Sequence, residues 1–213
     1  MRQNPSFTLA DVAEIRRVIT ANPWATIMSS GPDELVASHY AVLLDDDRDD
    51  LTIVGHVGRP DDQIHGMGER EMLVVFQGPH GYISPGWYGD VQAVPTWNYT
   101  AVHLSGTPEI LGDQENLEVL DRLVERFEGR MPDPRLMWER PNDETFVNRL
   151  AAGTVGFRLS PTRVVAKRKL SQNKPADTVE TIIAELEGGG PYAQPELAKE
   201  MRRAHDALAE ARR

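Results

Sequence analysis

The segment from Leu73 to Gly106, LVVFQGPHGYISPGWYGDVQAVPTWNYTAVHLSG, contains the pattern that decides the fold class. It opens with a β-branched and aromatic run and breaks at Gly78-Pro79. A turn region rich in glycine, proline and aromatic residues follows, and a second extended run covers Thr96 to Leu104. Two strands joined in this way suit the rim of a ligand site, because aromatic rings form flat apolar walls and glycine permits close backbone approach. The alternative is a long hairpin whose aromatic residues only cap a barrel.

Hydrophobic periodicity predicts further strands and peripheral helices around this segment. A short helical turn is expected after Pro60, ended by Gly66 and Gly68. One helix followed by a meander of strands indicates a small antiparallel sheet or barrel. Strands are expected at 24–29, 34–44, 51–56, 154–160 and 163–170, and amphipathic helices at 8–21, 113–128, 142–151, 177–187 and 195–211.

Length and composition describe an ordinary globular protein. The 213 residues are 40% hydrophobic and 26% charged, and no apolar run approaches the roughly 20 residues that a membrane span needs. The N-terminus lacks the apolar segment of a signal peptide, so a cytoplasmic protein is expected. The run Gly188–Pro191 is the one clear linker pattern, which predicts a domain over residues 1–190 and a docked C-terminal helix over residues 191–213.

Cysteine content and charge exclude several classes of function. The chain has no cysteine, which excludes disulfides, Cys-ligated zinc, iron–sulfur clusters and thiolate-ligated haem. A formal charge of -10 disfavours attraction to nucleic-acid phosphates, and no helix-turn-helix pattern is present. These features weigh against DNA binding, although the basic segment Arg163–Lys174, RVVAKRKLSQNK, keeps that alternative open.

Three segments together resemble one family. The segments QGPHGYISPGWY, VPTWNYTAVHLSG and KRKLSQNK, in this order, are similar to the PaiB-like proteins, which are often labelled FMN-binding negative transcriptional regulators. The resemblance runs from the N-terminal helix to about Pro191. It implies an α+β, mainly β fold, the FMN-binding-type split β-barrel with peripheral helices. It also implies a homodimer with a cofactor cleft at the subunit interface.

The resemblance leaves two functions open. One branch of the family, the piperazate synthases, binds haem and closes an N-hydroxylated ornithine into a ring by forming a nitrogen–nitrogen bond. This natural-product reaction, acting on a small amino-acid substrate, is the function that the sequence favours. The alternative is an FMN-binding negative transcriptional regulator. A plain interaction module without any chromophore is a third hypothesis. No Gly-rich phosphate loop opens a helix, so the residues themselves give FMN no independent support.

The segment after His56 favours haem over FMN as the cofactor. The family pattern there is G-H-x-x-R-A-N-P-Q-W; this chain keeps His56 and Arg59, but Ile64 replaces the tryptophan and His65 follows. Loss of an indole beside an added imidazole makes room for a macrocycle and supplies a ligand, so His65 is the expected axial haem ligand. His56 is the second choice. The alternatives are an exposed helix-end histidine at position 65 and a buried imidazole bonded to the backbone at position 56.

Other candidate site residues follow from residue type and strand alternation. Ser38 and Tyr40 should share one face of their strand, with His39 on the opposite face. Arg59, Lys167 and Lys169 are cations suited to propionate or carboxylate groups, although such residues are often only solvated. The predicted catalytic residues are His39, Tyr40 and Lys167, and the predicted cofactor-binding residues are His65, His56, Arg59, Trp97, Asn98, Lys169, Ser171 and Gln172. Under the FMN hypothesis the same cations would hold the phosphate, and the flavin ring would stack near Trp87 or Trp97.

Overall fold

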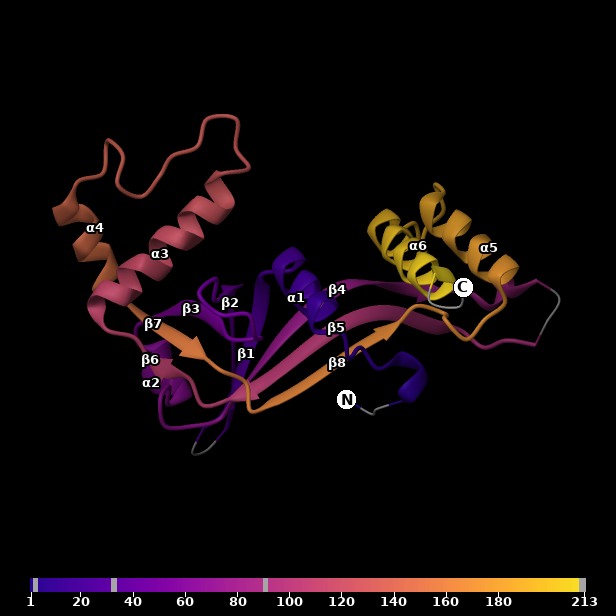
Figure 1. Ribbon diagram of the computed structural model, residues 1–213, viewed down its shortest axis with the longest axis horizontal. Helices are drawn as coiled ribbons and strands as arrows, with labels where there is room; N and C mark the ends of the chain where they lie inside the picture. The colour runs from indigo at the N-terminus through magenta and orange to yellow at the C-terminus, as the bar shows by residue number, and fades with distance from the viewer. Residues whose placement is uncertain (2–3, 32–33, 90–91, 211–213) are drawn as a thin grey trace. The chain divides into compact units, whose positions relative to one another are not determined.

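The computed structural model describes residues 1, 4–31, 34–89 and 92–210 of the chain, and its elements follow one another as drawn in Figure 1. In chain order they are η1 (Pro5–Phe7), α1 (Val12–Ala21), β1 (Trp24–Ser30), β2 (Leu35–Leu44), β3 (Ile53–Gly58), α2 (Asp61–His65), β4 (Met72–Ile83), η2 (Pro85–Tyr88), β5 (Thr96–Gly106), β6 (Glu109–Ile110), α3 (Asp113–Glu128), α4 (Glu144–Ala151), β7 (Thr154–Leu159), β8 (Arg163–Lys169), α5 (Ala176–Glu187) and α6 (Pro195–Glu210).

The strands are hydrogen-bonded in the order β6-β7-β3-β2-β1-β4-β5-β8, and each described register is antiparallel. The predicted split-barrel class, mainly β with peripheral helices, is confirmed. The chain also divides into two compact units, each assembled from separate segments. Unit 1 comprises Met1–Asp11, Gln77–Val102 and Val165–Arg213, and unit 2 comprises Val12–Phe76 and His103–Val164.

The central segment differs from the sequence prediction at its first strand. β4 does not end at Gly78-Pro79 but continues to Ile83. Proline is tolerated in a strand where its missing N–H faces no partner, so this pair alone does not end a strand. Gly81 serves packing rather than a turn, because a Cβ there would lie 2.9 Å from Leu197 Cδ2. The turn comes only at η2, where the Ser84 hydroxyl accepts a bond from the Gly86 N–H.

Helix positions agree with the hydrophobic pattern, with two local differences. α1 starts at Val12 rather than residue 8, because Thr8 forms an isolated β-bridge with Lys167. α4 starts at Glu144 rather than residue 142, because Asp143 caps it and its carboxylate accepts from the Phe146 N–H. On α4, Val147 is buried, whereas the apolar side chains of Phe146 and Leu150 are exposed. Periodicity identifies an apolar face but does not show whether another element covers it.

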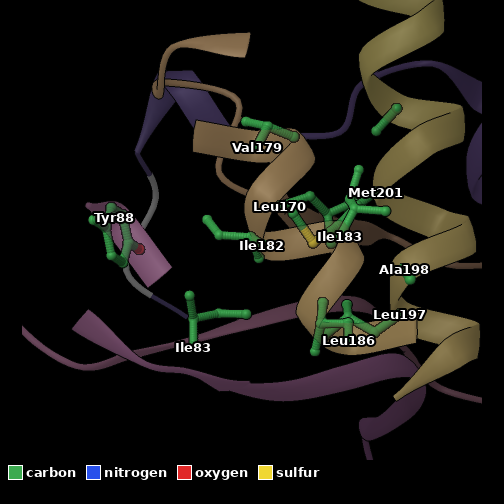
Figure 2. Packing of buried hydrophobic residues seen from close by; sticks show 11 residues of the cluster. Ile83, Tyr88, Leu170, Val179, Ile182, Ile183, Leu186, Leu197, Ala198 and Met201 are labelled. Atoms are coloured by element: carbon green, nitrogen blue, oxygen red, sulfur yellow. The ribbon is translucent and has the colours of Figure 1, made fainter. Parts of the chain in front are cut away.

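The core of unit 1 lies between α5, α6 and the η2 segment (Figure 2). α5 contributes side chains at the i, i+3, i+4 and i+7 spacing of a helix buried on one face, and α6 packs directly against it. The predicted C-terminal helix therefore belongs to this core. The Gln194 N–H donates to the Leu186 carbonyl and closes the glycine run between the two helices. The buried cluster comprises Ile83, Tyr88, Leu170, Val179, Ile182, Ile183, Leu186, Leu197, Ala198, Met201 and Ala204.

In unit 2, α3 packs across β3 and β7. Val54, Leu111, Val119 and Leu123 form a buried cluster on this face. The approach of α3 is close enough to require glycine at position 156, since a Cβ there would lie 2.8 Å from Asn116 Oδ1 and 3.0 Å from its Cα. Overpacking of this kind costs roughly 1–3 kcal/mol, so the glycine is a packing requirement.

A chain of hydrogen bonds attaches α2 to β1 and β2 in unit 2. Ser38 Oγ and Tyr40 OH both donate to Asp61 Oδ2 at 2.8 Å, so Ser38 and Tyr40 share a face as predicted. His65 is fully buried; its Nε2 lies 3.1 Å from Ser38 Oγ and its Nδ1 lies 2.8 Å from Ser29 Oγ. Because Ser38 donates to Asp61, it must accept from Nε2–H, which leaves Nδ1 to accept from Ser29. Bonds from Tyr40 and Ser38 hold the pKa of Asp61 below its usual value.

We expect Asp61→Asn to destabilise the protein at pH 7 by about 1–3 kcal/mol, because a carboxylate that accepts two hydroxyl bonds is replaced by a neutral amide. The pKa of Asp61 is lower in the folded state, so its contribution is present above the unfolded pKa and is lost as pH falls through the folded pKa. Urea unfolding at pH 7 and at pH 3 measures both effects. Asp133→Asn, at an exposed loop position, is the control. Equal unfolding midpoints for Asp61→Asn and the wild type at pH 7 would contradict this account.

Candidate functional site

A cavity of about 480 Å³ in unit 1 collects several of the predicted cofactor-binding residues. Asn98 comes from β5, Lys169 from the end of β8, and Ser171 from the turn that follows. The residues after η2 and the N-terminal η1 complete the wall. The lining residues are Phe7, Tyr88, Gln92, Ala93, Val94, Thr96, Asn98, Lys169, Ser171, Asn173 and Lys174.

The floor of this cavity holds a buried amide and a strained turn. Asn98 is fully buried, and its Nδ2 donates to Ser171 Oγ at 2.9 Å. Ser171 has a φ of 62°, a left-handed conformation that non-glycine residues rarely adopt. Such strain persists only where surrounding structure imposes it, and it is concentrated at ligand sites. The Lys174 N–H donates to the Ser171 carbonyl and tightens the same turn.

Two lysines give the cavity a positive charge. Lys169 Nζ donates to the Thr96 hydroxyl, and burial together with the neighbouring Lys167 lowers the Lys169 pKa. The ammonium group of Lys174 lies 5.0 Å from the centre of the Tyr88 ring. Burial raises the pKa of the Tyr88 hydroxyl, which therefore stays protonated and can donate. Cations, a hydroxyl and amides around one hollow suit the phosphate of a nucleotide or another compact anion.

The remaining unit 1 candidates lie away from this cavity's lining. Trp97 is exposed, and its ring centre lies 6.4 Å from that of His80 and 6.3 Å from that of Tyr82. Lys167 Nζ lies 5.5 Å from the centre of the Tyr99 ring. The Gln172 side chain accepts from the Leu170 N–H at 2.6 Å and so serves the turn itself. Asn98, Lys169 and Ser171 are therefore the three predicted residues that the fold brings together here.

The unit 2 candidates have different surroundings from those expected. His65 is neither an exposed helix-end residue nor open to a ligand, because both ring nitrogens contact serine hydroxyls. Burial lowers its pKa, which keeps the ring neutral. His39 is exposed, and its ring stacks on exposed Trp24 with centres 6.4 Å apart. Arg59 pairs with Asp62 at 3.4 Å on the surface.

His56 differs from His65 in having a buried nitrogen without a partner. Its Nδ1 forms no hydrogen bond, and burial lowers the pKa of the ring. The residue lines a second, mainly apolar cavity of about 340 Å³ together with α3, α4 and the segment between them. A buried polar atom without a partner is uncommon, and Asp62 Oδ1 and Thr100 Oγ1 are further examples among the described residues.

Sequence reasoning missed Tyr88, Thr96 and Lys174 as lining residues. Lys174 lies in the basic KRKLSQNK segment and Tyr88 in the aromatic turn, so both motifs contained the signal, but only folding shows which side chains meet. Among the described residues, no three of His, Cys, Asp and Glu are grouped as metal ligands. No helix in the described part of the chain has the length and apolarity to cross a membrane.

Comparisons with known proteins agree with the resemblance drawn from the motifs. Residues 1–163 match the model of the putative FMN-binding domain. The chain is 31% identical over 183 residues to "Protease synthase and sporulation protein PAI 2" of Bacillus subtilis, covering 85% of this chain and 86% of that protein.

Two solved structures share the fold at low sequence identity. The FAD and heme binding protein from Mycobacterium smegmatis has a TM-score of 0.58 and 19% identity, over 87% of this chain and 81% of that chain. The flavocytochrome Anf3 from Azotobacter vinelandii has a TM-score of 0.59 and 13% identity, over 79% and 72%. With the family match covering residues 1–163 and PAI 2 aligned along most of both chains, this chain belongs to the putative FMN-binding domain family.

Proposed function

We propose that the chain binds FMN and that the unit 1 cavity holds its phosphate. The observation that carries this proposal is the convergence of Lys169 and Lys174 on a hollow whose floor is the Asn98–Ser171 pair. Charge-assisted bonds from ammonium groups are the strong contacts available to phosphate. The FMN-binding description of the family supports the same cofactor. The flavin would supply redox chemistry when bound, and these side chains would position it.

We expect Lys169→Gln and Lys174→Gln each to weaken FMN binding roughly tenfold or more, because each removes a charge that pairs with phosphate. Riboflavin has the same ring without the phosphate, so its affinity should change little in either variant. Quenching of flavin fluorescence during titration gives all these dissociation constants. Lys199→Gln, on the exposed side of α6, is the matched control. If the variants lost affinity for FMN and riboflavin equally, the assignment of the FMN phosphate to this cavity would be wrong.

A second copy of the chain is the proposed partner. Trp24, Met28 and Leu35 on β1 and β2 are 66%, 37% and 85% exposed. Met28 and Leu35 help to line a mainly apolar hollow of about 390 Å³, and Trp24 begins the same strand as Met28. Large apolar side chains gathered on one sheet face mark interaction surfaces, because leaving them in water is unfavourable. A homodimer through this face would cover them.

We expect Leu35→Glu to convert a dimer into a monomer in sedimentation experiments, since a buried unpaired carboxylate opposes association. The substitution should leave the fold intact, because Leu35 is 85% exposed in the chain. Met131→Glu, at an exposed apolar position outside this face, is the control and should remain dimeric. Dimers of unchanged affinity in Leu35→Glu would refute the assignment of this face.

Haem is the second candidate cofactor, and His56 is the observation that favours it. An imidazole binds haem iron through a nitrogen that carries no proton or competing bond. Both nitrogens of His65 are engaged by Ser29 and Ser38, so iron ligation there would require one of those bonds to break. His56 lines an apolar cavity, and its buried Nδ1 has no hydrogen-bond partner. In this hypothesis the reaction is the cyclisation of an N-hydroxylated ornithine: the free amine bonds to the hydroxylated nitrogen and water leaves.

We expect a Soret band on addition of ferric haem to be lost in His56→Ala and retained in His65→Gln. A glutamine at position 65 keeps polar atoms for the two serines, so the fold should persist. His80→Ala, at an exposed histidine, is the control. Incubation with N-hydroxyornithine should then yield a product lighter by one water, measured by mass spectrometry. A tight flavin spectrum with no haem uptake, or a Soret band unaffected by His56→Ala, rejects this candidate.

A further inference from the structure

A groove of about 800 Å³ in unit 2 is lined by five arginines. Arg16 and Arg17 come from α1, and Arg122, Arg126 and Arg130 come from α3 and the residues just after it. The apolar floor is the end of β2. The only carboxylates in its lining, among the residues that the structure describes, are Asp46 and Glu125. This concentration of positive charge occurs in a chain whose formal charge is -10.

Two of these arginines, Arg122 and Arg126, lie on one face of α3, and Arg130 follows just after the end of the helix. Positions 122 and 126 are spaced at i and i+4, which places their side chains one above the other. Like charges at this spacing destabilise an isolated helix, so the two arginines make α3 less stable than it would be without them. A bound anion would offset this effect.

Two of the five arginines, Arg126 and Arg130, have no carboxylate partner among the residues that the structure describes. Arg122 pairs with Asp45 and Asp47, and Arg17 pairs with Glu14. Arg16 forms no close ion pair, but its charge helps to lower the pKa of the Asp50 carboxyl. Arg126 and Arg130 form no ion pair with any described carboxylate.

Arg16 and Arg126 are held in place by neutral backbone oxygens. Arg16 donates to the backbone carbonyls of Arg48 and Asp50, and Arg126 donates to the Thr20 carbonyl at 3.1 Å. Carbonyl acceptors fix a guanidinium without cancelling its charge. A guanidinium has five N–H donors, so donors remain free for a ligand.

We propose that this groove binds an organic polyphosphate of the nucleoside triphosphate class. Forked guanidinium donors match phosphate oxygens, and several arginines along one groove match a chain of phosphates better than a single anion. The apolar floor of Val42, Leu43 and Leu44 suits the ring system that such a ligand carries. This site lies in unit 2, and its residues are separate from the lysines assigned to FMN.

The test is calorimetric titration with ATP, inorganic tripolyphosphate and adenosine as probes. We expect ATP to bind more tightly than either part alone and to weaken as salt is raised, because screening acts on exposed charges. The double variant Arg126→Gln/Arg130→Gln should lose about tenfold or more in ATP affinity. The Arg130 side chain is exposed and bonds no described residue, and a glutamine in place of Arg126 retains an amide donor for the Thr20 carbonyl, so the variant should fold.

Two controls separate this groove from other sites. Arg202→Gln removes a surface arginine of α6 that is paired with Glu180 and Glu187, and its ATP affinity should equal that of the wild type. Lys169→Gln tests whether ATP enters the unit 1 cavity instead. Absence of saturable ATP binding, equal ATP affinity in the double variant, or loss of ATP binding in Lys169→Gln alone would each overturn the proposal.

Discussion

The hydrogen bond from the buried Asn98 amide to Ser171 is the interaction on which the candidate cofactor site depends. It joins β5 to the turn after β8, where Ser171 adopts a left-handed conformation. The turn leads to Lys174 in the cavity wall and then to α5, which contributes to the core of unit 1. The same hydrogen bond therefore supports both the core and the cavity wall. A buried amide without its partner would cost about 1–3 kcal/mol, which is why the two residues act as a pair.

Histidine in this fold has a structural role that residue type alone does not reveal. His65 lies between two serine hydroxyls, and through Ser38 it is connected to the Asp61 carboxylate. The network fixes the short helix α2 to two strands and favours a neutral imidazole, because burial opposes its charge. His56, earlier in the same segment, has one buried nitrogen that nothing in the described chain satisfies. The two histidines differ in their hydrogen-bond partners: two serine hydroxyls bond the His65 ring, whereas His56 Nδ1 has no partner.

For ligand binding, the charges that line each cavity matter more than the net charge of the chain. A chain with a formal charge of -10 nevertheless concentrates lysines at the unit 1 cavity and arginines at the unit 2 groove. Net charge governs long-range attraction, which salt screens over about 10 Å at 0.1 M. Within a cavity the nearest groups decide which ligand binds. An overall acidic composition therefore argues against extended contact with nucleic acid but not against binding of compact phosphates.

Sequence by itself determined the elements and the strand faces, because periodicity and alternation are local properties. α3 begins and ends where its apolar stripe predicts, and Ser38 and Tyr40 share a face as β alternation requires. The family motifs also pointed to Asn98, Lys169 and Ser171, which the fold places around one cavity. Only tertiary structure decided that Gly81 admits α6, that His65 is enclosed by serines, and that arginines from α1 and α3 line one groove. Those facts depend on which distant segments pack together, and no window of local sequence contains that information.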